Sequence, residues 1–139
     1  MEIVSKIGTV YKKEADIYHF LSDFRNIGNF IPTNQIAKWD AQEDQCRFDI
    51  IGIGDVEMRM IEKQPHKLVK LSGTSNTRNV DFTVWIQMKE VKESDNKVKI
   101  TLRAELPAML KMVAKKPIEK GLNKIIDNLD DLFQKADKA

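Results

Sequence analysis

The apolar positions of the chain follow two different periods. Between residues 14 and 24 they recur every three or four residues, which is the spacing of an amphipathic helix. Between residues 46 and 106 they recur at every second position and alternate with charged residues, which predicts β-strands with one apolar face. From Pro107 the helical period returns and predicts one helix of about 30 residues, because proline suits the first helical turn.

The segments near the N-terminus have weaker patterns. Residues 2–12 are β-branched and alternate loosely, with Ile3, Ile7 and Tyr11 on one side, so they predict a strand whose inward face is not fixed. The stretch "NIGNFIP" allows a second short helix that ends at Pro32. Residues 36–41 predict a further, weak strand.

These elements predict an α+β domain that spans residues 1–139. Each later strand has one apolar and one charged face, so one side of the sheet faces water and the other needs a cover. The terminal helix is the only large candidate, and we expect a curved antiparallel sheet of about six to seven strands wrapped around it, with two short helices after the first strand. The predicted apolar stripe of the helix consists of Leu110, Val113, Ala114, Ile118, Gly121, Leu122, Ile125, Leu129, Leu132 and Phe133.

The composition excludes several classes of protein. Hydrophobic residues make up 42% of the chain and charged residues 32%, as in soluble globular proteins, and no segment reaches the roughly 18 apolar residues of a membrane span. The N-terminus lacks the apolar core of a signal peptide, and the single cysteine, Cys46, excludes an internal disulfide. We therefore expect a cytoplasmic protein. Its net charge of +2 does not favour nucleic-acid binding.

Four stretches of the chain carry a resemblance to a known superfamily. They are "EADIYHFLSDFRNIGNFIP", "GDVEMRMIEKQPHKL", "VDFTVWIQMKEV" and "LPAMLKMVAKKPIEKGLNKIIDNL". In their order, the chain resembles the START-like helix-grip (SRPBCC) superfamily, which includes birch-pollen-allergen-like proteins, lipid-transfer domains and polyketide cyclases. It looks most like the small bacterial members of unassigned function. The resemblance implies a cavity between sheet and long helix that often holds an apolar ligand, and no catalytic residue carries over from it.

Methionines are concentrated in the segments that would line such a cavity. Methionine is flexible and polarisable, so it suits a surface that adapts to varied apolar shapes, although buried methionines also serve as ordinary core residues. Together with the inward positions of the strands and of the helix, they define the predicted ligand-binding residues. These are Met58, Met60, Phe82, Val84, Ile86, Met88, Leu102, Ala104, Met109, Met112, Val113 and Gly121.

The terminal helix breaks two rules of helix composition. Gly121 and Pro117 lie in its interior, and Gly121 shares a face with Ala114. One interpretation is that small residues and a proline kink leave room for a ligand; the other is that they allow the helix to pack closely on the sheet. Five lysines against one acid precede residue 127, which opposes the helix dipole. They form either a solvated face or a basic rim that attracts an anionic head group or membrane.

Few residues are candidates for catalysis or metal binding. Glu62 follows the register of Met58 and could point inward, which makes it the one candidate buried acid, although a solvent-facing position is the alternative. His19 and His66 are far apart and resemble no metal site, so we expect neither a metal nor another cofactor. Cys46 falls on the apolar face of its strand and is interpreted as a small buried hydrophobe.

The leading hypothesis is a protein that binds an apolar or amphipathic molecule, lipid-like or polyketide-like, between sheet and helix. A cyclase- or dehydratase-type enzyme using the same cavity is the first alternative, and it requires an inward polar pair. A protein-interaction module is the second, because Trp85 falls on the wet face of an apolar strand, where it either contacts a partner or packs over lysine side chains. Contact with a membrane is not favoured. The identity of the ligand and the oligomeric state stay open.

Overall fold

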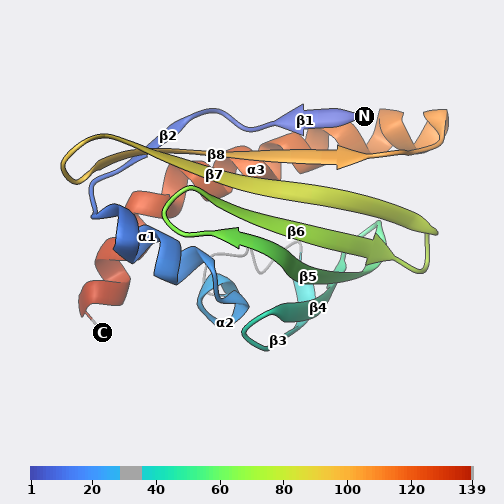
Figure 1. Ribbon diagram of the computed structural model, residues 1–139. Helices are drawn as coiled ribbons and strands as arrows, with labels where there is room; N and C mark the ends of the chain where they lie inside the picture. Colours follow the sequence, from blue (N-terminus) through green and yellow to red (C-terminus); the bar gives the residue numbers. More distant parts are fainter. Residues whose placement is uncertain (29–35, 139) are drawn as a thin grey trace.

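The computed structural model describes residues 1–28 and 36–138, with side chains of the last helix described as far as Phe133 except at 130 and 132. Its eight strands form one antiparallel sheet in the order β1-β8-β7-β6-β5-β4-β3, in which β2 also pairs with β8 (Figure 1). The elements are β1 (Glu2–Val4), β2 (Gly8–Val10), α1 (Glu14–Leu21), α2 (Phe24–Ile27), β3 (Ile36–Ala41), β4 (Gln45–Ile50), β5 (Gly54–Gln64), β6 (Leu68–Ser75), β7 (Val80–Lys92), β8 (Asp95–Ala104) and α3 (Ala108–Lys138).

The predicted helix-grip architecture is confirmed. Helix α3 is continuous through Pro117 and runs along one face of the sheet (Figure 1). Helix α1 lies close to β6 and β7, and α2 lies next to α1. The predicted second short helix begins earlier than expected, at Phe24, where the Asp23 side chain accepts a hydrogen bond from the backbone N–H of Arg25 and caps the first turn. The proposed end of that helix at Pro32 lies outside the described residues. Within the described residues, no helix is long and apolar enough to span a bilayer.

The predicted first strand is divided into two. Val4 pairs with Thr101 and Gly8 with Val98, so four steps along one strand face three steps along β8 and one residue is extra. This extra residue reverses the inward phase, so Ile3 and Val10 are both buried whereas Ile7 is exposed. The predicted grouping of Ile3 with Ile7 and Tyr11 is therefore wrong.

Two other bulges change the course of the sheet. In β5 the register shifts between Met60 and Glu62, which places Ile61 in solvent and turns the following residues over. In β3, at the outer edge, the register shifts between Ala37 and Asp40, and Lys38 lies in the left-handed region with φ of 57°. A bulge moves all the following side chains of a strand to the other face of the sheet. The alternation of apolar and charged residues along the sequence does not show where such a shift occurs.

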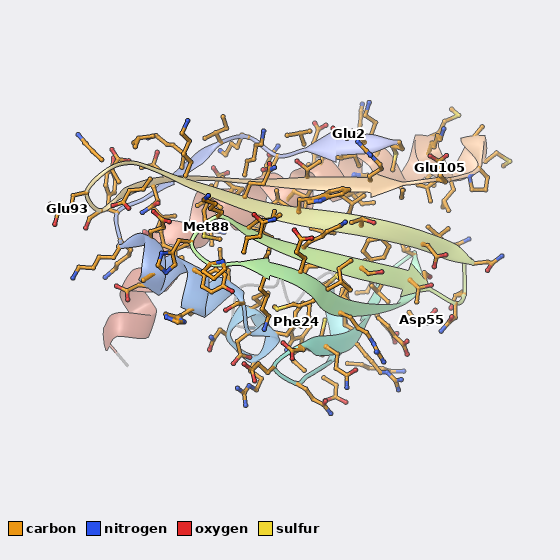
Figure 2. The ribbon with its side chains drawn as sticks, viewed as in Figure 1. Glu2, Phe24, Asp55, Met88, Glu93 and Glu105 are labelled. Atoms are coloured by element: carbon orange, nitrogen blue, oxygen red, sulfur yellow. The ribbon has the colours of Figure 1, made fainter. Side chains whose placement is uncertain are left out.

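The sheet has two well-separated ends. The β4–β5 connection, the β6–β7 connection and the start of α3 lie at one end, and the β7–β8 hairpin lies at the other (Figure 1). Figure 2 places Asp55 and Glu105 at the first end and Glu93 at the second. Ile53, Arg78 and Leu106, which line the candidate site, come from the connections at the first end.

Close packing anchors the second half of α3. Ile126, Leu129 and Phe133 are buried, and the Phe133 ring lies 4.7 Å from that of Phe20, centroid to centroid. A Cβ on Gly8 would lie 2.4 Å from Cγ2 of Ile126, so only glycine permits this approach of β2 to the helix. A hydrogen bond and an ion pair also hold this part of α3 to the edge of the sheet.

The segment between β1 and β2 makes those polar bonds. The backbone N–H of Lys6 donates to Oδ1 of Asn123 at 2.7 Å, and the Lys6 ammonium pairs with Asp127. The Ser5 hydroxyl accepts a hydrogen bond from the Ile100 N–H, which replaces a bond of the interrupted strand ladder. The break in the first strand therefore ties α3 to the edge of the sheet.

Candidate functional site

A cavity of about 300 Å³ lies between the concave face of the sheet and the first half of α3. This volume is at the lower end of the ~300–1,000 Å³ range typical of small-molecule pockets. Side chains from α1, α2, every strand from β3 to β8, and α3 line it. The core therefore has an unfilled region where a close-packed interior would be expected.

The described lining of the cavity is almost entirely hydrocarbon. It contains no carboxylate, imidazole, thiol or lysine side chain. Its polar side chains are the Ser75 hydroxyl, the Arg78 guanidinium and the indole of Trp39, and the backbone amine of Met1, which donates to the Ala104 carbonyl at 2.8 Å, lies near by. Such a lining can bind apolar surface, but it offers no pair of groups for acid–base chemistry.

The surroundings of Gly121 distinguish the two interpretations of the small residues on α3, which are room for a ligand and close packing on the sheet. Beyond its own helical backbone, no heavy atom lies within 4 Å of the position that a Cβ at residue 121 would occupy. Pro117 and the buried Ala114 line the same stretch of the cavity. The small residues on this face therefore border open space, and close packing of the helix on the sheet does not explain Gly121.

The structure brings most of the predicted ligand-binding residues together. They come from β5, β7, β8 and α3, and all of them border the cavity because their strands present alternate residues to α3. The residues of this group are Met58, Phe82, Val84, Ile86, Leu102, Ala104 and Gly121.

Five predicted residues lie elsewhere. Met60 packs against the core and Met88 is buried near the opposite end of the sheet, and neither borders the cavity. The inward orientation predicted for Met109, Met112 and Val113 is wrong, since they are 83%, 83% and 67% exposed. Met112 is two residues from both Leu110 and Ala114, which line the cavity, so it faces the opposite side of the helix.

The candidate buried acid takes the solvent-facing position that was its alternative. Glu62 is exposed and accepts a hydrogen bond from the Gln64 amide at 2.6 Å. The bulge after Met60 turns it away from the register of Met58. Cys46, by contrast, is buried as expected, and loss of hydration raises the pKa of its thiol to about 12, so it is not a nucleophile at neutral pH.

Trp85 lies on the outer face of the sheet between two cations. The Lys70 ammonium is 5.6 Å and the Arg103 guanidinium 5.5 Å from its ring centroid. Both contacts have the geometry of a cation–π interaction, so neighbouring side chains of the protein cover much of this tryptophan. The lysines of α3 at positions 111, 115, 116, 120 and 124 are all exposed.

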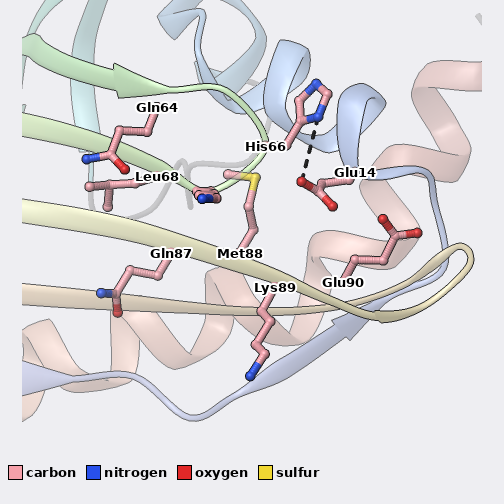
Figure 3. Close-up of a pocket in the computed structure, with 9 residues that line it drawn as sticks. Glu14, Gln64, His66, Leu68, Gln87, Met88, Lys89 and Glu90 are labelled. Atoms are coloured by element: carbon pink, nitrogen blue, oxygen red, sulfur yellow. Dashed lines mark ion pairs between the residues drawn. The ribbon is translucent and has the colours of Figure 1, made fainter.

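A second, open pocket lies at the other end of the sheet (Figure 3). There His66 Nδ1 is 3.6 Å from Glu14 Oε1, and the His66 ring contacts Tyr18. Desolvation, with a hydrogen bond and charge repulsion from Glu90, raises the pKa of Glu14. These groups connect α1 to two hairpins. Among the described residues, no three His, Cys, Asp or Glu side chains are placed to hold a metal ion.

The sequence patterns missed several residues of the cavity. Trp39, whose ring centroid lies 5.5 Å from that of Phe48, comes from the weakly patterned β3. Ser75 and Arg78 lie in the polar stretch of residues 73–79, where the alternation of apolar residues stops. The spacing of Leu71 and Ser75 continues the inward phase of β6 and could have identified Ser75 as an inward residue.

Comparisons with known proteins show the fold. No family model and no curated protein match the sequence. Norcoclaurine synthase from Thalictrum flavum, a point mutant bound to a transition-state analogue, matches with a TM-score of 0.75 at 12% identity, over 99% of this chain and 96% of that one. XoxI from Bacillus cereus matches with a TM-score of 0.73 at 12% identity, over 98% and 97%.

A conserved protein from Geobacillus kaustophilus matches with a TM-score of 0.72 at 11% identity, over 97% of this chain and 95% of that one. Each of these matches covers nearly the whole of both chains. At these identities the likeness concerns the fold alone.

Proposed function

We propose that this protein binds an apolar small molecule, lipid-like or polyketide-like, in the cavity between the sheet and α3. The observation that carries the proposal is the unfilled space beside Gly121, enclosed by hydrocarbon side chains of the sheet and the helix. An apolar cavity of this kind stays dry and takes up apolar guests.

Burial of apolar surface would drive binding. Each square ångström of apolar surface removed from water contributes roughly 25 cal/mol, and dispersion contacts with a previously unfilled wall add to this. The solved structure of a norcoclaurine synthase mutant with a transition-state analogue is one case in which a protein of similar fold holds a small molecule. The cyclase or dehydratase alternative lacks candidate acid–base groups in the described lining.

A fluorescence titration tests the proposal. N-phenyl-1-naphthylamine is a neutral apolar probe that brightens when it leaves water, and we expect saturable binding to the wild-type protein. Gly121→Leu places a side chain in the unfilled space, so it should weaken binding at least about tenfold without lowering the melting temperature. Lys120→Leu, one residue away on the exposed face, is the matched control and should bind as the wild type does.

Two results would count against the proposal. One is an absence of saturable binding by the wild-type protein. The other is equal binding by the wild type and Gly121→Leu, which would locate the probe somewhere other than this cavity. Native mass spectrometry of the purified protein would show in addition whether it retains an apolar molecule.

A further inference from the structure

Ser75 and Arg78 border the cavity at one end of the sheet. Ser75 is the last residue of β6 and pairs with Val80, the first residue of β7, and Arg78 lies in the connection between them. All three border the cavity, as does Ile53 in the facing β4–β5 connection. A molecule in the cavity would therefore meet hydrocarbon along most of its length and, at this end, a serine and the one arginine of the described lining.

The Ser75 hydroxyl has no partner in the described structure. Ser75 is 4% exposed, and its Oγ atom is fully buried without a hydrogen bond. The residue shares the inward face of β6 with Leu71, which also lines the cavity. A buried hydroxyl without a partner is unfavourable, and proteins rarely retain one without a reason.

Arg78 is held in place by the neighbouring turn. Its Nε donates to the Ile53 carbonyl at 3.0 Å and its Nη2 to the Gly52 carbonyl at 3.2 Å. A guanidinium has five N–H donors, so further donors stay available. Both of these partners are neutral carbonyls, and the ion pairs of the described residues include none to Arg78.

The Asp55 carboxylate beside this loop is engaged by Thr77. Asp55 accepts hydrogen bonds from the Thr77 hydroxyl and, at 2.8 Å, from the Thr77 backbone N–H. These bonds lower the pKa of Asp55 and fix the loop that carries Arg78. The loop is thus braced from both sides, and the exposed Arg78 borders the cavity from it.

We infer that Ser75 and Arg78 bind the head group of the ligand, and that this head group is a carboxylate. This inference rests on the proposed function and specifies its ligand class. A carboxylate accepts hydrogen bonds only, which suits a guanidinium and a hydroxyl. Arg78 is the one cationic side chain of the described lining, and the Met1 ammonium, which also belongs to that lining, donates to the Ala104 carbonyl. The chain or ring system would extend from there toward Gly121.

Matched ligands test the inference. Dodecanoic acid, dodecan-1-ol and methyl dodecanoate share one chain and differ in the head group, and each would compete with N-phenyl-1-naphthylamine at pH 7.5. We expect the acid to compete about tenfold better than the alcohol and the ester, because charge-assisted bonds replace those lost from water. Arg78→Gln should remove this preference, and Arg78→Lys should restore part of it.

Two further variants separate a ligand role from a structural one. Arg59→Gln removes the same charge from an exposed position on β5 and should keep the preference for the acid. Ser75→Ala removes a hydroxyl that bonds nothing in the described structure, so the melting temperature should stay equal or rise. Its affinity for the acid should fall several-fold while that for the ester does not change.

The possible failures are distinguishable. If the wild type binds the probe but the acid and the ester compete equally, the head-group inference is wrong and the proposed apolar cavity stands. The inference is also wrong if Ser75→Ala lowers the melting temperature and leaves the acid preference intact. If the wild type does not bind the probe, the proposed function fails first.

Discussion

Toward its C-terminal end α3 is pressed against the sheet, whereas along its first half it borders a cavity. In the second half Ile126 meets Gly8 too closely for any other residue there, and Lys6 bonds both Asn123 and Asp127. In the first half a Cβ added at Gly121 would have no heavy atom within 4 Å beyond the helix's own backbone. The second half of α3 therefore contributes to stability through close packing, whereas the first half leaves space for a ligand.

The largest expected difference between the halves comes from two isoleucines. Ile126→Ala should lower the free energy of unfolding by about 2–5 kcal/mol, because it opens a void in a packed region. Ile118→Ala, at the cavity, should cost about 1 kcal/mol, since its surroundings already contain unfilled space. Urea unfolding of both variants measures the difference, and equal losses would contradict the division of α3 into two halves.

Two glycines should respond with opposite signs. Gly8→Ala should lower the free energy of unfolding by about 1–3 kcal/mol, because its Cβ would overlap Ile126. Gly121→Ala should raise it by about 0.5–1 kcal/mol, because alanine is the better helix former and the space is open. Thermal unfolding gives both signs. A destabilised Gly121→Ala would mean that the helix lies closer to the sheet than described.

Two methionines should separate the inner from the outer face. Met58→Gln should cost about 1–3 kcal/mol and weaken probe binding, because it introduces an amide into an apolar lining. Met112→Gln should change the free energy of unfolding by less than about 0.5 kcal/mol and leave probe binding unchanged, because the side chain is already in water. Weaker probe binding by Met112→Gln would restore the predicted role of that residue.

The smallest expected effect concerns the polar tie at the anchor. Asn123→Ala should lower the free energy of unfolding by about 0.5–1.5 kcal/mol relative to Asn128→Ala. Both substitutions improve helix propensity equally, and Asn128 is exposed, so their difference isolates the bond to the backbone of Lys6. Identical stabilities would show that water replaces this bond without loss.

The strand patterns predicted the sheet and much of the cavity, because alternation fixes which residues of β7 and β8 face the helix. Val84 and Leu102 illustrate this success. The pattern could not show the bulges, so Ile7 was grouped with Ile3, and Glu62 became a candidate for an inward position. Met109 and Met112 were placed inside because methionine suits a plastic pocket, although helical spacing from Leu110 and Ala114 opposed it.

The rest of the site required the fold. Ser75 and Arg78 meet the cavity only because the β6–β7 connection folds against the β4–β5 connection, some 25 residues earlier in the chain, through the Arg78 bond to Ile53. Phe24 contributes to the lining from a helix whose position no local pattern determines. Contacts between distant segments depend on tertiary packing, which a single sequence does not encode in its spacing.

The bulge in β3 has a consequence for how molecules meet one another. An open sheet edge offers unpaired backbone groups to any passing strand, and a protein with an apolar interior is at particular risk of polymerising through it. At this edge Lys38 turns into a left-handed conformation, breaks the regular row of donors and acceptors, and carries its charge toward Asp49, 3.5 Å away. The opposite edge is interrupted between β1 and β2. Neither edge of the sheet therefore offers a regular row of backbone donors and acceptors to a strand of another molecule. This disfavours edge-to-edge assembly into fibres.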